Sequence, residues 1–409
     1  MISKRQFLQN SLVSGMTAMG FPARASDPWG AELAYPSGWG PNGQIPKWEA
    51  YTEYRVGNYS GGFEQMFKHR IIERGEHVSP LVEDLKDLRY RWGVDQRGPD
   101  DYLSQWPVTS LLIARDGKVM YEGHRMGRTP VQRMTSWSMA KSVTSLLFGI
   151  AMDQGLIQSL DDLPQTHVPQ LKNTLHGQIP LRHLLNMSSG VDVVHERDPH
   201  RIDVPALLGD PLTRAMGTDV EKVVRQWTGA LEAPGVRFNY NELCPLTIGM
   251  VIRSVSGMSL SEFAQRYLWQ PIGAEAAATW LTDSQSKEYN CVGFAARTRD
   301  WARLAQLVAQ NGRMMNRQIV SEKWINECAS WGEQDRQVMW GSARADTGYK
   351  NFFWHPRKDG NWMVMNGHHG QRVVIDRSSR TICVQTAVSH VGPWSREFFT
   401  LFEAATRMK

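Results

Sequence analysis

The stretch Thr135–Gly155, TSWSMAKSVTSLLFGIAMDQG, decides how the rest of the sequence is interpreted. Its apolar residues recur at close to the 3.6-residue period of an α-helix, at Ala140, Val143, Leu147 and Ile150. We therefore expect a helix over 139–154, with Gly155 as its C-terminal stop and Ser138 at its start. Lys141 lies one turn after Ser138, and positions i and i+3 of a helix share a face.

A serine and a lysine placed in this way can form a nucleophile and its activator. Desolvation or a neighbouring cation would lower the pKa of Lys141, which could then accept the proton of Ser138. The free backbone N–H groups at the helix start would face an oxyanion. A second copy of the pattern, Ser284–Lys287, lies in a polar stretch with no apolar helix behind it, and we interpret it as a solvated loop.

A tyrosine at the start of a second predicted helix could complete the group that moves protons. Residues 234–242, PGVRFNYNE, indicate a turn, and residues 243–255 have a helical pattern. If Tyr240 lies near Lys141, the ammonium stabilises the phenolate, which can act as a base or a proton shuttle. The alternative is a core tyrosine whose hydroxyl is hydrogen-bonded.

A third candidate element is the stretch 365–371, MNGHHGQ, between two late predicted strands. Its glycines allow the backbone to approach a ligand closely. An edge strand with a free N–H at this point could supply a second oxyanion donor. The alternative is a plain hairpin turn in which His368 and His369 are polar turn residues.

The order of the predicted elements indicates an α+β fold. A hairpin is predicted around Asp116-Gly117, helical patterns fill the chain from 137 to about 260, and strands return after Asn351 before a last helix near 393–408. This order suits one antiparallel sheet built from both ends of the chain and flanked by helices, with an all-helical domain inserted. The predicted segments are an export signal (1–25), an N-terminal extension packing on the catalytic domain (26–85), a sheet domain (86–136 and 290–409) and a helical domain (137–289).

Composition argues against several other classes of protein. The 409 residues are 41% hydrophobic and 21% charged, which is typical of a soluble globular protein. The formal charge of +5 is mild and no long Lys/Arg run occurs, so no nucleic-acid partner is expected. Beyond the N-terminal segment no stretch reaches about 18 apolar residues, so no stable membrane insertion is expected.

The cysteines and the N-terminus bear on cofactors and localisation. The four cysteines, at 244, 291, 328 and 383, lack zinc-like spacing, so no metal is expected; buried free thiols are favoured, and their pairing stays open.

Lys4-Arg5 precedes a weakly apolar stretch that ends at the small residues Ala23-Arg24-Ala25, as before a signal-peptidase site. The segment resembles a twin-arginine export signal with Lys4 in place of the first arginine, which predicts a periplasmic protein. The alternative is an ordinary N-terminal helix.

In this order, the three elements resemble the serine β-lactamase and penicillin-binding-protein superfamily over about residues 86–405. Two more stretches, 184–190 and 299–304, are similar to it. The resemblance is greatest to the branch with a catalytic tyrosine, which holds class C β-lactamases, D-aminopeptidases, family VIII-type esterases and 6-aminohexanoate-dimer hydrolases. It implies a β-lactamase/transpeptidase-like fold.

The resemblance also implies a role for each matching residue. Ser138 would be the nucleophile, Lys141 its activator and Tyr240 the base. The backbone N–H groups of Ser138 and His368 would form the oxyanion hole, with Asn366 and Gly367 beside the substrate.

Two positions depart from the pattern of this superfamily. Class C enzymes have Tyr-x-Asn, but here the third position is Glu242, which could pair with Lys141 and hold it protonated or could favour the helix N-terminus. Both interpretations stay open. The Lys-Thr-Gly of penicillin-recognising enzymes appears as Met365-Asn366-Gly367. Because a thioether carries no charge, the cation for a β-lactam carboxylate is missing, which argues against efficient β-lactamase or carboxypeptidase action.

The sequence therefore predicts a serine hydrolase that acts through an acyl-enzyme on an ester or amide bond of a small molecule. It needs no metal or organic cofactor. One alternative is a hydrolase of β-lactams or D-amino-acid peptides, and another is a non-catalytic binding or sensor protein on the same fold. The natural substrate and the oligomeric state stay open.

Overall fold

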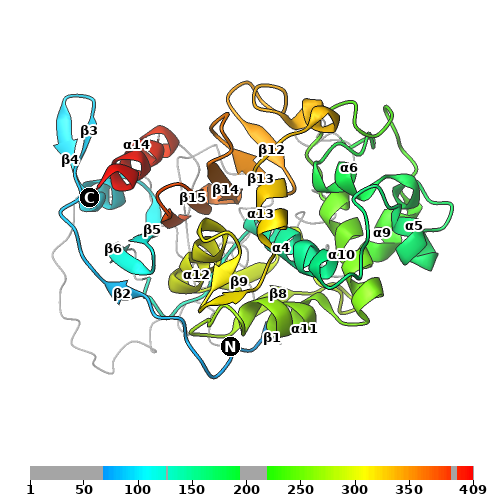
Figure 1. The fold of residues 1–409 in the computed structure, drawn as a ribbon, viewed down its shortest axis with the longest axis horizontal. Coiled ribbons are helices and arrows are strands. Elements are labelled where there is room, and N and C mark those ends of the chain that lie inside the picture. Colours follow the sequence, from blue (N-terminus) through cyan, green and yellow to red (C-terminus); the bar gives the residue numbers. More distant parts are fainter. Residues whose placement is uncertain (1–67, 126–127, 194–218, 388–393, 409) are drawn as a thin grey trace, which may run out of the picture.

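The computed structural model describes residues 68–125, 128–193, 219–387 and 394–408 (Figure 1). The predicted export signal and most of the predicted N-terminal extension lie outside these residues, so both stay predictions. Within the described ranges no single helix has the length and apolar character needed to cross a membrane, although the bent pair Leu243–Ser256 and Leu260–Trp269 does when taken as one unit.

A large sheet occupies the centre of the fold (Figure 1). Its eight strands are, in spatial order, β12 (Gly348–Lys350), β13 (Phe353–His355), β14 (Trp362–Asn366), β15 (Arg372–Asp376), β16 (Thr381–Ala387), β5 (Val108–Arg115), β6 (Lys118–His124) and β2 (Val82–Glu83). All neighbouring strands are antiparallel except β2 and β6. Because β16 pairs with β5, both ends of the chain build one sheet, which confirms the predicted fold class.

The predicted hairpin is the β5–β6 pair, and its turn shows why the sequence signal was strong. Asp116 and Gly117 both have positive φ, 48° and 76°. A two-residue turn with this conformation matches the right-handed twist of the flanking strands, and Asp-Gly is one of the pairs that adopt it most readily.

The alternation of side chains along the strands divides the interior into two cores. Leu112 and Ala114 of β5 face the larger core, while Leu111 and Ile113 face the smaller one, as the period of two requires.

The helices are α3 (Pro99–Gln105), α4 (Met139–Asp153), α5 (Pro164–His167), α6 (Leu181–Leu185), α9 (Val220–Gln226), α10 (Leu243–Ser256), α11 (Leu260–Ala264), α12 (Thr298–Ala309), α13 (Glu322–Glu327) and α14 (Trp394–Arg407). Helices α4 and α12 contribute to the larger core and α14 to the smaller.

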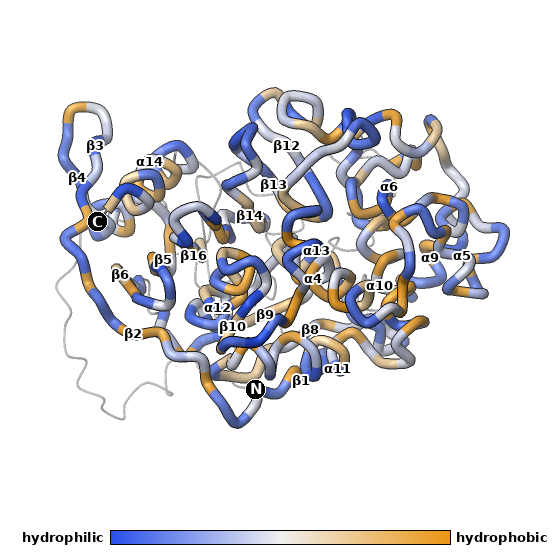
Figure 2. The backbone as a smooth tube through the Cα atoms, in the orientation of Figure 1, coloured by the Kyte–Doolittle hydropathy of each residue, from blue (hydrophilic) through white to orange (hydrophobic). Residues whose placement is uncertain are grey.

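Helix α4 lies in the middle of the molecule, between the sheet and the helical part formed by α5, α6, α9 and α10 (Figure 1). Its residues from Met139 to Ala151 are all buried. The first eleven residues of α10, Leu243–Arg253, are buried as well, and its apolar stretch is orange in Figure 2. Such all-round burial explains why α4 and α10 are apolar on most sides, unlike a surface helix.

A second, four-stranded sheet lies below α4 in the view of Figure 1, with the order β1 (His69–Ile72), β8 (Ala278–Leu281), β9 (Phe294–Ala296) and β7 (Met134–Thr135). Strand β8 falls inside the range predicted as the helical domain, so that range is not helical throughout. The predicted domain boundaries themselves stay a prediction. Two small hairpins complete the fold, β3 (Tyr90–Trp92) with β4 (Asp95–Arg97), and β10 (Arg313–Met314) with β11 (Arg317–Gln318).

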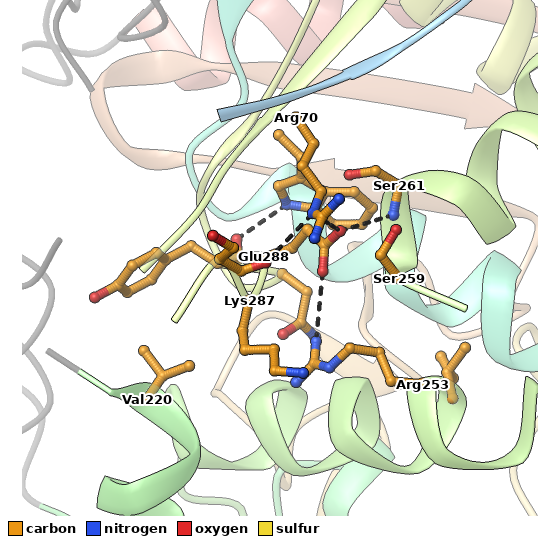
Figure 3. Close-up of polar contacts among 12 residues, drawn as sticks. Arg70, Val220, Arg253, Ser259, Ser261, Lys287 and Glu288 are labelled. Carbon is orange, nitrogen blue, oxygen red and sulfur yellow. Dashed lines mark hydrogen bonds and ion pairs between the residues drawn. The ribbon is translucent and has the colours of Figure 1, made fainter. Parts of the chain in front are cut away.

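A buried carboxylate joins the second sheet to the helices. Glu288 is 0% exposed, and its Oε1 accepts a hydrogen bond of 3.0 Å from the backbone N–H of Ser261, near the start of α11. Its two oxygens lie 3.5 Å from Nε of Arg70 on β1 and 3.7 Å from Nη1 of Arg253 on α10 (Figure 3). The carboxylate thus ties β1, α10 and α11 to the loop that leads into Cys291.

We expect Glu288→Gln to lower the free energy of unfolding by about 2–4 kcal/mol, because it removes the fully buried carboxylate charge that faces Arg253, whose other carboxylate partner is Glu221 at 2.9 Å. The expected loss is below the usual range for a broken buried pair because Arg253 keeps Glu221 and because the Arg70 side chain is 40% exposed. The matched control is Glu403→Gln, which breaks an exposed i,i+4 pair with Arg407 and should cost about 0.5 kcal/mol or less. Urea unfolding measures both; equal effects would contradict the role given to Glu288.

Candidate active site

The turn before α4 positions Ser138. Ser136 donates its backbone N–H to the Phe294 carbonyl at 2.8 Å and its Oγ to the Val292 carbonyl at 3.2 Å, which fastens the turn to the second sheet. Trp137 then has a φ of 45°, a left-handed conformation that costs a non-glycine residue about 1–3 kcal/mol and that recurs at active sites as well as in turns. Ser138 occupies the N-cap position of α4 without a capping hydrogen bond from its side chain, so its hydroxyl is not committed to the helix backbone.

Lys141 is buried, 1% exposed, and oxygen atoms of Ser138, Cys291 and Glu242 lie within 3.1 Å of its Nζ. Its Nζ lies 2.9 Å from Ser138 Oγ and 3.1 Å from the Cys291 carbonyl oxygen. The third partner is the Glu242 carboxylate, whose Oε2 is 2.5 Å away and which is itself buried. The predicted juxtaposition of Ser138 and Lys141 is therefore present, because one helical turn brings the two side chains together.

Glu242 makes the contact with Lys141 that the first of its two interpretations requires. The carboxylate pairs with Lys141, and it makes no side-chain capping bond to α10, although Glu242 is the N-cap residue of that helix. Burial alone would favour the neutral amine, but Glu242 and Tyr240 outweigh it and raise the pKa of Lys141 above its usual range. The raised pKa favours the ammonium form of the resting lysine, so these neighbours oppose the lowered pKa that desolvation alone would give.

Tyr240 lies on the turn into α10, with its ring 4.8 Å from Lys141 Nζ. Burial raises the pKa of its phenol, and the Lys141 ammonium and the hydrogen bond with Ser138 oppose that rise without cancelling it. The Glu242 carboxylate adds to the rise. The phenol is thus neutral at rest and in contact with both Ser138 and Lys141.

The loop 184–190 holds the tyrosine turn in place. Asn239 donates its backbone N–H to the Met187 carbonyl at 2.7 Å, and Asn241 Nδ2 contacts Ser189 Oγ at 3.4 Å. Asn241 also accepts the Cys244 N–H through its Oδ1 at 3.1 Å, which caps the first turn of α10. These contacts give a structural reason for the stretch 184–190 that resembled the superfamily in sequence.

The stretch 365–371 meets the Ser138 turn at Gly367. A Cβ at that position would lie 2.2 Å from the Ser136 carbonyl oxygen and 3.2 Å from the Cβ of Trp137, so only glycine permits this approach. The next residue, His368, packs its ring edge-on against Trp137 with 5.4 Å between ring centroids. This places the segment predicted to carry the second oxyanion donor beside the turn that carries Ser138.

Met365 and Asn366, the last two residues of β14, have structural partners of their own. Met365 is 0% exposed and packs in the larger core, so it brings no charge to the site. The Asn366 side chain accepts hydrogen bonds of 3.0 and 2.9 Å from Arg372 through its Oδ1. A role of the Asn366 side chain in substrate binding stays a prediction, and the structure gives its oxygen a structural partner.

Four aromatic rings form a wall beside the site, and we call Phe238, Tyr240, Tyr349 and Trp354 the aromatic wall. Tyr240 stacks on Trp354 with 5.7 Å between centroids and an angle of 25°, and Tyr349 meets Trp354 edge-on at 4.7 Å. The Phe238 ring lies 5.1 Å from that of Tyr349. Three of the four side chains keep partial exposure, while Tyr349 is buried behind them.

The geometry of the site agrees with the comparison with known families, since the family model described as Beta-lactamase matches residues 62–395. The chain belongs to the Beta-lactamase family. Members of this family that act as hydrolases, esterases and amidohydrolases work through an acyl-enzyme, so the chain is a serine hydrolase of β-lactamase type.

The chain is also similar to proteins that are named for the hydrolysis of compounds other than β-lactams. The chain is 21% identical to the 6-aminohexanoate-dimer hydrolase of Paenarthrobacter ureafaciens, over 75% of this chain and 76% of the relative. It shares its fold with a Bacillus anthracis protein assigned to the same hydrolases, at a TM-score of 0.74, 20% identity, and 85% and 92% coverage of the two chains. A family VIII carboxylesterase has a TM-score of 0.57, 16% identity, and 75% and 96% coverage.

Several parts of this β-lactamase-type site were not identified from the sequence. The Cys291 carbonyl left no signal, because every residue has a carbonyl. Trp354 and Tyr349 were hidden among the many aromatic residues, and their position beside Tyr240 depends on contacts far apart along the chain. The second copy of the serine–lysine pattern is the solvated loop that was predicted, with Ser286 in a left-handed turn at φ 60°.

Gly367→Ala should separate the 366–368 segment from the Ser138 turn and lower kcat/KM by about 10²-fold or more, because displacements of about 1 Å at a catalytic site have effects of this size. The matched control is Gly98→Ala. Gly98 has nearly the same backbone conformation, with φ −116° against −121° for Gly367, but its Cβ would meet no atom closer than 3.5 Å.

Ester hydrolysis and circular dichroism are measured on both variants. A fully active Gly367→Ala, or equal losses in the two variants, would show that the close approach at Gly367 does not position the site.

Proposed function

We propose that the chain hydrolyses an ester or amide bond of a small molecule, with Ser138 as the nucleophile. The observation that carries the proposal is the contact of Lys141 Nζ with Ser138 Oγ at 2.9 Å, made by an ammonium that Glu242 and the Cys291 carbonyl hold in place. A nucleophile with a proton-transfer group in contact, which is itself oriented by a third group, is the general arrangement of covalent hydrolases.

The reaction then follows from the positions of these groups. Ser138 Oγ attacks the carbonyl carbon, and its proton passes to the group formed by Lys141, Tyr240 and Glu242. The oxyanion that develops faces the backbone N–H groups of Ser138 and His368. The same group returns the proton to the leaving oxygen or nitrogen, which leaves an ester between Ser138 and the acyl part. In the second half, water attacks this ester and gives one proton to the same group, which passes that proton to Ser138 Oγ as the acyl part leaves as a carboxylic acid.

The three groups Lys141, Tyr240 and Glu242 act as one titrating unit because they are in contact and share their protons. At rest the unit holds the Lys141 ammonium, the Glu242 carboxylate and the neutral Tyr240 phenol. It must lose one proton before it can accept the proton of Ser138. Glu242, by neutralising the ammonium, makes that loss harder, and so places the active form of the enzyme at higher pH than a neutral residue at position 242 would.

The absence of charge at Met365 supports an ester or amide substrate over a β-lactam. Met365 is buried in the core, and the position that carries a lysine in penicillin-recognising enzymes therefore offers no cation. The relative from P. ureafaciens is named for an amide dimer and not for a β-lactam, which supports the same choice.

A panel of p-nitrophenyl butyrate, a small p-nitroanilide and nitrocefin tests the proposal. We expect turnover of the ester and the amide, loss of at least about 10³-fold in kcat for Ser138→Ala, and no turnover of nitrocefin. Nitrocefin turnover as fast as that of the ester would favour a β-lactam hydrolase. If the wild-type protein cleaves none of the three, a binding or sensor protein is favoured instead.

The pH dependence of kcat/KM tests the role of Glu242. Since the pKa values of Lys141 and Tyr240 are both raised, kcat/KM should increase toward alkaline pH in the wild-type protein. Glu242→Gln removes a contribution that raises both pKa values, so the rising limb should move to lower pH. Glu403→Gln, far along α14 and exposed, should leave the profile unchanged. An unchanged limb, or one moved to higher pH in Glu242→Gln, would contradict the shared unit.

A further inference from the structure

One exposed cation lies at the outer edge of the aromatic wall. The guanidinium carbon of Arg344 is 4.5 Å from the centre of the Trp354 ring, and Trp354 stacks in turn on Tyr240 at 5.7 Å. Arg344 is therefore separated from the proton-transfer group by a single aromatic ring. A guanidinium that lies on an indole face is attracted by the quadrupole of the indole ring. Its N–H groups point outward in the plane of the guanidinium and remain free to bind an anion.

The Arg344 guanidinium has no ion pair and no side-chain hydrogen bond with any residue in the described part of the chain. Asp346, two positions further on, is exposed and forms no ion pair with it. The backbone is nevertheless fixed, because Arg344 and Thr347 exchange two N–H···O bonds of 3.3 Å across a tight turn. Other cations near the sheet are used internally: Lys350 lies 2.6 Å from Asp335.

The spacing between Arg344 and Ser138 is held by buried contacts. The β12–β13 hairpin, which carries Tyr349 and Trp354, is anchored by Lys350 through Asp335 and Glu327, at 2.6 and 2.9 Å. Its turn is tied to α4 by Ser142, which donates to the Phe352 carbonyl at 2.7 Å. Ser142 directly follows Lys141, so the wall and the nucleophile are fixed to the same turn of the same helix.

We propose that Arg344 binds a carboxylate at the far end of the substrate, while the aromatic wall contacts the apolar part between that carboxylate and the scissile bond. The inference rests on the proposed function and names its substrate class: esters or amides with an apolar spacer and a terminal carboxylate. A bidentate guanidinium–carboxylate pair fixes both the position and the orientation of a substrate, which the uncharged Met365 on β14 cannot do.

Matched p-nitrophenyl esters of dicarboxylic acids test this proposal, each compared with the methyl ester of the same chain. For the best spacer length, the free acid should have a kcat/KM about ten-fold or more above that of its methyl-capped analogue. Arg344→Ala should reduce the ratio of acid to capped ester by about ten-fold. Arg344→Lys should keep part of the preference, since it retains the charge but not the planar pair.

The matched control is Arg357→Ala. Arg357 is also exposed and stacks on an indole, at 4.6 Å from the Trp362 ring, but Trp362 belongs to the smaller core and not to the aromatic wall. This variant should leave the preference for the acid unchanged. Equal losses in Arg344→Ala and Arg357→Ala would overturn the assignment.

Binding to Ser138→Ala separates this inference from the proposed function, because it needs no turnover. Isothermal titration should give a dissociation constant for the acid ester about ten-fold below that of the capped ester, and the double variant Ser138→Ala/Arg344→Ala should lose the difference. Equal binding of the two esters would overturn the role of Arg344 even if the wild-type protein hydrolyses both. Preferential binding of the acid without any hydrolysis would support Arg344 and count against the proposed function.

Discussion

The site depends on one buried ion pair, between Lys141 on α4 and Glu242 at the start of α10. Neither charge would stay inside the protein alone, because removing an ion from water costs several kcal/mol. The pair holds because its geometry is close and because the remaining N–H groups of the ammonium have partners, in Ser138 and in the Cys291 carbonyl. The two helices are thereby fixed to each other at the position where Ser138 and Tyr240 must meet.

Three distant parts of the chain converge on this pair, and the sheet explains how. Strands from both ends of the chain meet at β16 and β5, and this brings the 365–371 stretch against the turn before α4. The second sheet supplies the loop that carries Cys291, and Glu288 ties that loop to β1, α10 and α11. Three parts of the chain therefore fix the position of Ser138: the 365–371 stretch after β14, the start of α10 and the loop that carries Cys291.

Local features were the part of this arrangement that the sequence could predict. The helical period of α4 predicted that Lys141 shares a face with Ser138. The Asp116-Gly117 pair predicted the turn of the β5–β6 hairpin. The turn signal before α10 predicted that Tyr240 lies at the start of that helix. The charge state of Lys141 could not be predicted, because it depends on how closely Glu242 approaches across two helices. The Cys291 carbonyl and the stacking of Tyr240 on Trp354 have no sequence pattern either, since both arise from contacts between residues far apart along the chain.

Glu242 also gives the site a different electrostatic balance from one with an uncharged residue at that position. The carboxylate keeps the lysine charged and the phenol neutral, so chemistry must begin with the loss of a proton from the unit as a whole. Arg344 adds a second charge, at the far side of the aromatic wall, where no carboxylate of the described residues neutralises it. The two features together suggest a site that accepts an anionic substrate and works best above neutral pH.

The central claim, that Ser138 is the activated nucleophile, is tested most directly by covalent labelling with a fluorophosphonate probe, followed by intact-mass measurement and peptide mapping. The account predicts a single adduct on the peptide that contains Ser138, absent from Ser138→Ala. Labelling that survives in Ser138→Ala, or a wild-type protein that takes up no label, would contradict it.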